Sequence, residues 1–320
     1  MRLSTVIAWL LGVALLATLI ALNHPANILE AVAALRGWLP LVILFHAVPL
    51  YFDVVAWQRL FAMPPPLAAL FGIRWVAEGV NGLFPVPHLG EFLRAQMTRR
   101  LSPHGEAAAS VVVDVTLGVA TQVLFAIIGL ALFSAVSSTS TLLHALLFAT
   151  AVITFCAAVF YFLQHAGMFA LAAAVVRRWP GPAQRAFDMA DARALDGRVR
   201  TLYQRRPELF LAGVWRLAGW IAGAGEIWLI LYGLGHPVSF TDAIILESLS
   251  QAARTAAFAI PGGLGVQDGA LLILCAQLGL PAEIGLALSL AKRCRELALG
   301  LPGLVIGYVI EARRLAAVGE

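Results

Sequence analysis

Two groups of polar side chains lie in stretches of sequence that are otherwise apolar. Within each group the steps are four residues and then three, which places the members on one face of a helix. The members are Arg74, Glu78 and Asn81 in the first stretch and Glu247, Gln251 and Arg254 in the second. Each face carries one acid, one amide and one arginine, and this combination offers both donors and acceptors to a polar ligand.

A helix-breaking segment follows each polar face, and an acid comes soon after it. Pro85-Val-Pro87 precedes Gly90-Glu91 and Arg94, and Pro261-Gly-Gly-Leu-Gly precedes Gln267-Asp268. Inside a membrane, interrupted backbone is tolerated only where protein buries it or where it lines a cavity, because its polar groups otherwise lack partners. The glycines at 262 and 263 either expose N–H groups to an anion or serve as a flexible break, and both interpretations stay open.

We expect these features to form a substrate-binding site. Its candidate residues are Glu78, Asn81, Glu91, Arg94, Glu247, Arg254, Gly262, Gly263, Asp268 and Arg293. A charge at the centre of a membrane helix costs about 2.5–3.5 kcal/mol on insertion scales, so such residues mark cavities or paired contacts.

Other charges in apolar segments have simpler interpretations. Arg216 lies near the start of its helix and is expected to snorkel to the interface. Lys292 and Glu296 are four residues apart and are expected to pair. For Asp53 the cavity and a snorkelling or paired position stay equally open, as they do for Arg293. Asp114 belongs to a polar stripe that suits a buried helix contact.

Catalytic and metal chemistry have little support in the sequence. The three cysteines show no CxxC spacing, and the seven histidines are isolated, without an HExxH motif, so we predict no metal site. Glu78 and Glu91 could form an acid–base pair, but no nucleophile accompanies them. We therefore predict no catalytic residue, no cofactor and no enzyme, with an intramembrane transferase as the remaining enzymatic alternative.

The composition is that of a polytopic helical membrane protein. Of 320 residues, 61% are hydrophobic and 12% are charged, with a mean hydropathy of +0.86, whereas soluble domains carry about 25% charged residues. The segments apolar and long enough to span a bilayer are 6–22, 38–57, 107–133, 142–163, 209–233 and 283–311. The first is expected to be a retained helix rather than a signal peptide.

The arginines orient these spans. The segment 166–208 carries eight arginines against four acids, so the positive-inside rule places it in the cytoplasm. Counting spans outward puts both termini inside and makes 67–98 and 240–280 re-entrant helical hairpins that enter from opposite faces. This is the inverted-repeat arrangement of secondary transporters, whose substrate site lies near the midplane.

The predicted fold is therefore an all-α membrane protein with six spanning helices and two oppositely oriented re-entrant hairpins. It forms a single integral domain over 1–320, comprising a first half (1–165), the basic loop 166–208 and a second half (209–320). The expected location is a bacterial-type cytoplasmic (inner) membrane. The basic loop either lies on anionic membrane lipids as an amphipathic helix or is a solvated loop.

Several motifs resemble those of a known family. They are Trp75-Val-Ala-Glu-Gly-Val-Asn-Gly-Leu-Phe-Pro85, Gly90-Glu91-x2-Arg94, Pro261-Gly-Gly-Leu-Gly-x-Gln-Asp268 and Ala287-Leu-Ser-Leu-x-Lys-Arg293. Together they resemble the flippase-like transmembrane region of lysylphosphatidylglycerol synthases and their stand-alone relatives. The chain has no soluble aminoacyl-transfer domain, so the resemblance does not imply synthase activity.

Further motifs are similar to one branch of that family, the hopanoid-biosynthesis-associated membrane proteins. They are Ser110-Val-Val-Val-Asp114-x-Thr-Leu-Gly, Leu234-Gly-His-Pro-Val-Ser239, Leu246-Glu-Ser248 and Lys292-Arg-x-Arg-Glu-Leu-x-Leu-Gly-Leu-Pro-Gly303. The resemblance implies lipid handling and points to the candidate residues above. Asp268 stands where relatives usually have glutamate, which shortens the reach of that carboxylate.

The sequence thus predicts a lipid transporter of the flippase type for an amphipathic substrate, such as a hopanoid or a phospholipid. The alternative is a membrane scaffold that does not transport and gathers lipid-biosynthesis enzymes. The expected partners are the lipid substrate, anionic lipids at 166–208 and those enzymes, with no nucleic acid.

Overall fold

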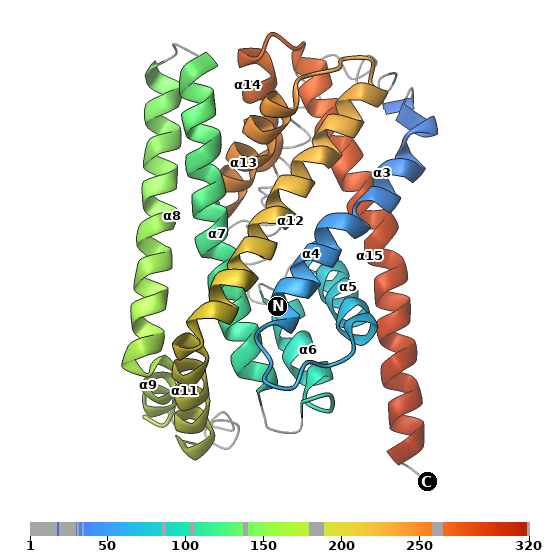
Figure 1. Cartoon of the computed structure of the whole chain (residues 1–320). Helices are drawn as coiled ribbons and strands as arrows, with labels where there is room; N and C mark the ends of the chain where they lie inside the picture. The colour runs from blue at the N-terminus through green and yellow to red at the C-terminus, as the bar shows by residue number, and fades with distance from the viewer. Residues whose placement is uncertain are drawn as a thin grey trace.

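The structure is a computed structural model that describes residues 18, 30, 32–33, 35–84, 88–102, 106–136, 140–178, 189–257 and 265–318. Every element in these ranges is helical (Figure 1). In chain order they are η1 (Leu35–Gly37), α3 (Leu39–Phe45), α4 (Ala47–Gln58), α5 (Leu67–Leu83), α6 (Leu89–Thr98), α7 (Ala107–Val136), α8 (Ser140–Ala166), α9 (Met168–Val176), α11 (Met189–Gln204), α12 (Arg206–Gly233), α13 (Phe240–Ala256), α14 (Val266–Gln277) and α15 (Ala282–Val318).

Four stretches of the described residues are long and apolar enough to cross a membrane. They are Leu39–Gln58, Ala107–Val136, Leu142–Ala166 and Arg206–Gly233, and they match four of the six expected spans. The first expected span, 6–22, lies outside the described residues. The last corresponds to α15, which is 37 residues long but carries four charges within 292–296. Six spans and two re-entrant hairpins therefore stay a prediction.

The span expected over 38–57 is interrupted at His46. Helices α3 and α4 meet there, and Pro49 lies three residues further on. Proline has no N–H to donate to the carbonyl four residues earlier, so the helix loosens at Phe45. The backbone N–H of Leu50 still donates to the His46 carbonyl at 3.3 Å. The interruption leaves His46 between two helical segments, next to the centre of the bundle.

The two predicted hairpins, α5 with α6 and α13 with α14, lie towards opposite ends of the bundle, and α15 packs against both (Figure 1). Glycines bring the backbones together at each contact. A Cβ added at Gly79 of α5 would lie 2.8 Å from the carbonyl oxygen of Gly300, and one added at Gly285 would lie 2.8 Å from the Cα of Leu272. Helix α15 is thus the common support of the two hairpins.

Two apolar clusters occupy the two ends of the bundle, with a polar layer between them. The lower cluster, at the end of the bundle that carries α6 and α11 in Figure 1, includes Val54, Trp57, Leu70, Val113, Val199 and Ala212. The upper cluster includes Phe125, Ile227, Ile230, Leu246, Leu274 and Leu288. Along α12 the order is Ala212, then the buried Arg216 and Glu226, then Ile230. The buried charged residues of α12 therefore lie between the two apolar clusters.

The basic segment 166–208 folds into two helices where it is described. Helix α11 has buried residues at Ala192, Asp196, Val199 and Leu202, a spacing of three and four that defines one helical face. The Asp196 carboxylate accepts the backbone N–H groups of Phe169 and Ala170 at 3.2 and 2.9 Å and so caps the N-terminus of α9. This segment is amphipathic and packs on the bundle rather than forming only a solvated loop.

Candidate functional site

A cavity of about 550 Å³ lies in the polar layer, between the two hairpins. Its charged and titratable lining residues are His46, Asp53, Arg74, Glu78, His88, Glu91, Arg216, Glu226, Glu247, Arg254, Lys292, Arg295 and Glu296. They come from α4, α5, α6, α12, α13 and α15 and from the turns beside α4 and α6. Five of the ten predicted site residues line the cavity: Glu78, Asn81, Glu91, Glu247 and Arg254.

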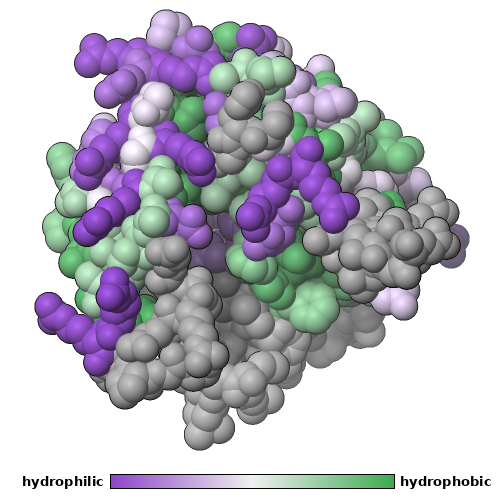
Figure 2. All heavy atoms as spheres, turned by 90° about the horizontal axis from the view of Figure 1, so that it is seen from below, coloured by the Kyte–Doolittle hydropathy of each residue, from purple (hydrophilic) through white to green (hydrophobic). Residues whose placement is uncertain are grey.

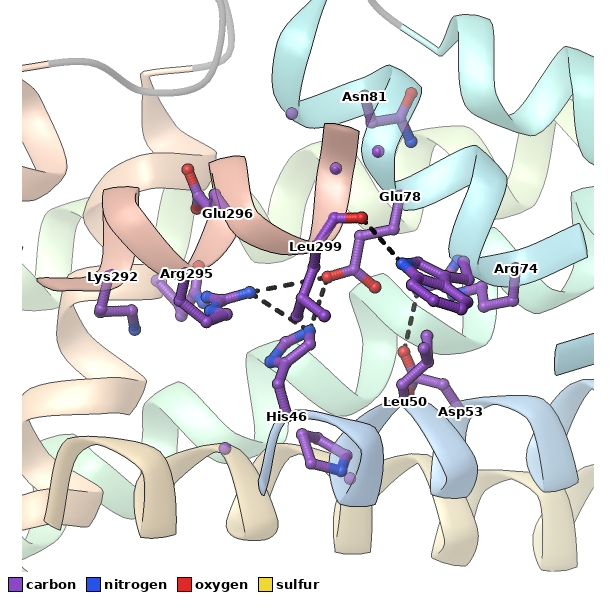
Figure 3. Close-up of a pocket in the computed structure, with 18 of the residues that line it drawn as sticks. His46, Leu50, Asp53, Arg74, Glu78, Asn81, Lys292, Arg295, Glu296 and Leu299 are labelled. Atoms are coloured by element: carbon purple, nitrogen blue, oxygen red, sulfur yellow. Dashed lines mark hydrogen bonds and ion pairs between the residues drawn. The ribbon is translucent and has the colours of Figure 1, made fainter. Parts of the chain in front are cut away.

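The wall formed by α5 is organised around His46. Its Nε2 lies 2.7 Å from Glu78 Oε1, and its Nδ1 lies 2.8 Å from Glu226 Oε2. Arg295 donates through Nε to Glu226 at 3.1 Å, and its Nη1 lies 3.7 Å from Glu78. In Figure 3 the His46, Glu78 and Arg295 side chains converge from three separate chain segments. In the sequence His46 is one of seven isolated histidines and is not among the predicted site residues. The signal that could have identified it is its position inside an apolar span, three residues before Pro49.

The opposite wall, from α13, is organised around Glu247. Glu247 is 4% exposed. Its carboxylate accepts hydrogen bonds from Lys292 Nζ at 2.5 Å and from Gln251 Nε2 at 2.8 Å. The expected pairing of Lys292 with Glu296 is wrong. Glu296 instead pairs with Arg293 at 2.9 Å and with Arg254 at 3.4 Å. The spacing favoured a local pair, but α13 offers both α15 residues partners across the helix contact.

The side-chain amide of Asn81 joins the end of α5 to the start of α6. Asn81 donates through Nδ2 to Glu91 Oε1 at 3.0 Å and accepts the backbone N–H of Gly90 at 2.8 Å. A Cβ at Gly90 would collide with the Ala77 carbonyl and with Asn81, so only glycine allows α6 to approach α5 this closely. Within the described part of the chain the second carboxylate oxygen of Glu91 is buried without a hydrogen-bond partner, and His88 Nδ1 lies 3.8 Å from it. It is an acceptor available beside the cavity.

A buried ionic network extends from the cavity lining, which includes Asp53, Arg74 and Arg216, to Asp114 of α7. Arg216 Nη1 lies 3.1 Å from Asp53 and 3.6 Å from Asp114, and Arg74 donates to Asp53 at 2.9 Å. Arg216 is 7% exposed, so the expected snorkelling is wrong. Its guanidinium lies against Gly118, and the absence of a side chain at that glycine makes room for the ion pairs. The two acids join α4 and α7 to α12, in agreement with a buried helix contact at Asp114.

Three predicted site residues lie outside the cavity lining, namely Arg94, Asp268 and Arg293. Arg94 is fully buried, donates to Asp114 at 2.6 Å and stacks 4.1 Å above the Trp57 ring. Asp268 accepts the backbone N–H of Gly265 at 2.6 Å and the Ser289 hydroxyl, with Arg293 Nη2 at 3.5 Å.

These contacts fasten α6 to α7 and α14 to α15. Two further predicted residues, Gly262 and Gly263, lie outside the described residues, as do the proline breaks at 85–87 and 261.

A family model described as the lysylphosphatidylglycerol synthase TM region matches residues 6–303. The chain therefore belongs to that family and, with its apolar helices, is a multi-pass membrane protein related to lipid handling. Neither a curated protein nor a solved structure matches the chain. The hopanoid-associated branch stays a prediction.

Proposed function

We propose that the protein carries the polar headgroup of an amphipathic lipid through the central cavity, so that the lipid moves between leaflets. The observation that carries this proposal is the cavity itself, a charged chamber of about 550 Å³ inside an apolar helical bundle. Ligand sites span roughly 300–1,000 Å³, so this volume suits a headgroup while the apolar part of the lipid stays in the bilayer.

The charge balance of the lining narrows the headgroup class. The lining includes six carboxylates and five arginine or lysine side chains. The formal charge is −1 with both histidines neutral and 0 with His46 protonated, the form in which both of its ring nitrogens can donate to Glu78 and Glu226. Most of these charges are paired with each other. A strongly anionic or cationic headgroup would have to displace such pairs at a high desolvation cost. We therefore favour a headgroup that is polar or zwitterionic.

Two cavity residues are best placed to touch that headgroup. The Glu78 side chain is 37% exposed and the Arg254 side chain is 30% exposed, and they lie on the two opposing hairpins. Among the described residues Arg254 contacts one acid, Glu296 at 3.4 Å, and this leaves most of its donors for a ligand. Glu247 is largely enclosed by Lys292 and Gln251, so it positions that wall of the site.

The transport cycle follows from the placement of the hairpins. We propose that α5/α6 and α13/α14 are re-entrant units of an inverted repeat, entering from opposite faces, and that each in turn opens the cavity to one leaflet. Their shared support on α15 suits this role, because movement of either hairpin changes its contact with the same helix.

The experiment is lipid movement in reconstituted vesicles. Full-length protein is placed in liposomes with a labelled phospholipid or a labelled hopanoid, and accessibility of the label in the outer leaflet is followed with time. We expect wild type to move one of them and Arg254→Ala to slow the movement at least about tenfold, the effect of a lost charge-assisted contact. Glu247→Ala is expected to slow it as well.

The matched control is Arg193→Ala, which removes an exposed arginine of α11 far along the chain from the cavity lining. Equal lipid movement by folded Arg254→Ala, Glu247→Ala and wild type would exclude the mechanism. Wild-type vesicles that move no more lipid than empty vesicles would exclude transport. Mass spectrometry of lipid that co-purifies with the protein identifies the substrate and tests the hopanoid branch.

The rival proposal is a scaffold for lipid-biosynthesis enzymes. It is favoured by the exposed basic side chains of α11, which include Arg193 and Arg198. Deleting 166–208 would also remove Val199 and Leu202 from the lower apolar cluster, so neutralising exposed arginines is the cleaner test. Loss of enzyme recruitment with unchanged lipid movement would assign the two activities to separate parts of the molecule. Product formed by the purified protein from lipid alone would instead indicate a transferase.

A further inference from the structure

A second polar recess lies where α8, α11 and α12 meet, outside the central cavity. We name it the interfacial groove, and it is lined by Tyr161, His165, Arg200, Tyr203, Gln204 and Arg206. It belongs to the lower end of the molecule in Figure 1, where α8 ends and α11 runs into α12. Viewed from below, hydrophilic side chains are numerous on this end of the molecule (Figure 2).

The aromatic wall of the groove is held from behind by a buried amide. Tyr203 donates its hydroxyl to Gln164 Oε1 at 2.6 Å, and Gln164, which is fully buried, donates to Thr116 at 2.9 Å. The His165 ring stacks on Tyr203 at 5.1 Å, and Tyr161 meets the His165 ring edge-on at 4.6 Å. Burial raises the pKa of Tyr203 to about 12, so the phenol keeps its proton. The wall is a fixed feature of the fold.

Two arginines supply the charge of the groove. Within the described ranges neither Arg200 nor Arg206 forms an ion pair, although the adjacent Arg205 pairs with Glu208 at 3.8 Å. Asp196, the acid one turn before Arg200, is engaged by the N-terminus of α9. Two guanidinium groups therefore face the groove with their donors available, and this arrangement suits the oxygens of a phosphate.

The groove also lies beside the end of the apolar span of α8, where the membrane interface is expected. The apolar span of α8 ends at Ala166, next to His165, and its last turns expose Phe162 and Leu163. Tyrosine at the end of a span is typical of the membrane interface, and basic pockets between helices at that level bind anionic headgroups. Acyl chains could lie along the exposed apolar side of α8 while the phosphate sits in the groove.

We propose that the interfacial groove binds the phosphate of an anionic phospholipid from the leaflet at whose surface α11 lies. This site is separate from the central cavity and does not depend on the transport proposal. It gives the basic segment a specific ligand contact in place of a diffuse attraction to the membrane. Bound lipid would connect α8, α11 and the start of α12.

The test is lipid binding by the full-length protein in detergent, measured by native mass spectrometry with added phosphatidylglycerol. Arg200→Gln with Arg206→Gln is expected to weaken binding roughly 30-fold, given the contribution of each arginine near an anionic surface. The matched control is Arg100→Gln with Arg193→Gln, which removes the same charge from exposed positions outside the groove and is expected to bind as wild type. Arg200→Lys with Arg206→Lys preserves the charge, and its affinity for phosphatidylglycerol is expected to stay within about threefold of wild type.

Size-exclusion chromatography establishes that each variant is folded, and the lysine variant supplies the comparison if the glutamine variant aggregates. Equal phosphatidylglycerol binding by the glutamine variant and wild type would overturn the proposal. An equal loss in the control pair would do the same, because it would assign binding to general surface charge. Phosphatidylcholine bound as tightly as phosphatidylglycerol, or inorganic phosphate displacing the lipid at equal concentration, would exclude a site for anionic phospholipid.

Discussion

The two hairpins share a pattern in the sequence but use their acids differently in space. Glu78 and Glu247, the acids before the breaks, both line the central cavity. The acids after the breaks diverge: Glu91 also lines the cavity, whereas Asp268 is 1% exposed and lies outside the lining. The acid that follows the break is therefore a cavity residue in the first helix pair and a structural contact in the second.

The difference follows from the helix that each acid meets. Asp268 faces α15, where Ser289 and Arg293 are both within reach of its carboxylate. Glu91 is held by Asn81 of its own hairpin, and its second oxygen has no hydrogen-bond partner among the residues that the structure describes. A buried carboxylate that is fully engaged serves stability, whereas one with an unused acceptor beside a cavity is available to a ligand.

Removal of the Asp268 carboxylate is expected to have the largest effect on stability. Asp268→Ala leaves the Gly265 N–H without its acceptor and Arg293 without one of its two acids. The loss of one member of a buried ionic contact costs about 3–5 kcal/mol, so we expect aggregation or a large fall in Tm in detergent. Glu91→Ala is the matched variant in the other hairpin, and a similar fall there would contradict the distinction drawn between them.

The acids before the breaks provide the second comparison. Glu247→Gln leaves Lys292 buried beside an amide, and we expect it to cost about 3 kcal/mol. Glu78→Gln changes a carboxylate that is 37% exposed, so we expect a loss of about 1 kcal/mol. Thermal unfolding of both variants measures the difference. Adding Lys292→Gln to Glu247→Gln should restore part of the lost stability, and no restoration would show that the pair is not the cause.

The contact of the first hairpin with α15 allows a smaller, steric test. Gly79→Ala would place its methyl 2.8 Å from the Gly300 carbonyl, and such overpacking costs about 1–3 kcal/mol. Gly72→Ala on the same helix meets nothing within 4 Å, and it should be neutral or slightly stabilising because alanine favours helix. Comparable Tm values for these two variants would show that α5 and α15 tolerate separation at this point.

The sequence predicts the helices well because their signals are local. Helices α7, α8 and α12 begin and end within a few residues of the expected spans, since apolar runs, prolines and glycines act on their own neighbourhood. The sequence does not predict the division of 38–57 at His46 or the bounds of α9 and α11. Of the five predicted site residues that line the cavity, four are identified from their spacing on two helical faces: Glu78, Asn81, Glu247 and Arg254. The sequence misses His46, and it misassigns Arg216, Lys292 and Glu296, because their partners lie on distant helices.

The smallest change in stability should accompany a change in function. Glu91→Gln keeps an oxygen to accept from Asn81, so we expect the free energy of unfolding to shift by less than about 0.5 kcal/mol. It removes the charge from the unused oxygen beside the cavity, and we therefore expect lipid movement to slow several-fold while Tm stays constant. Glu208→Gln, an exposed acid of α12 outside the lining, is the control. Unchanged lipid movement in Glu91→Gln would make both post-break acids structural, and the asymmetry between the hairpins would then lie in stability alone.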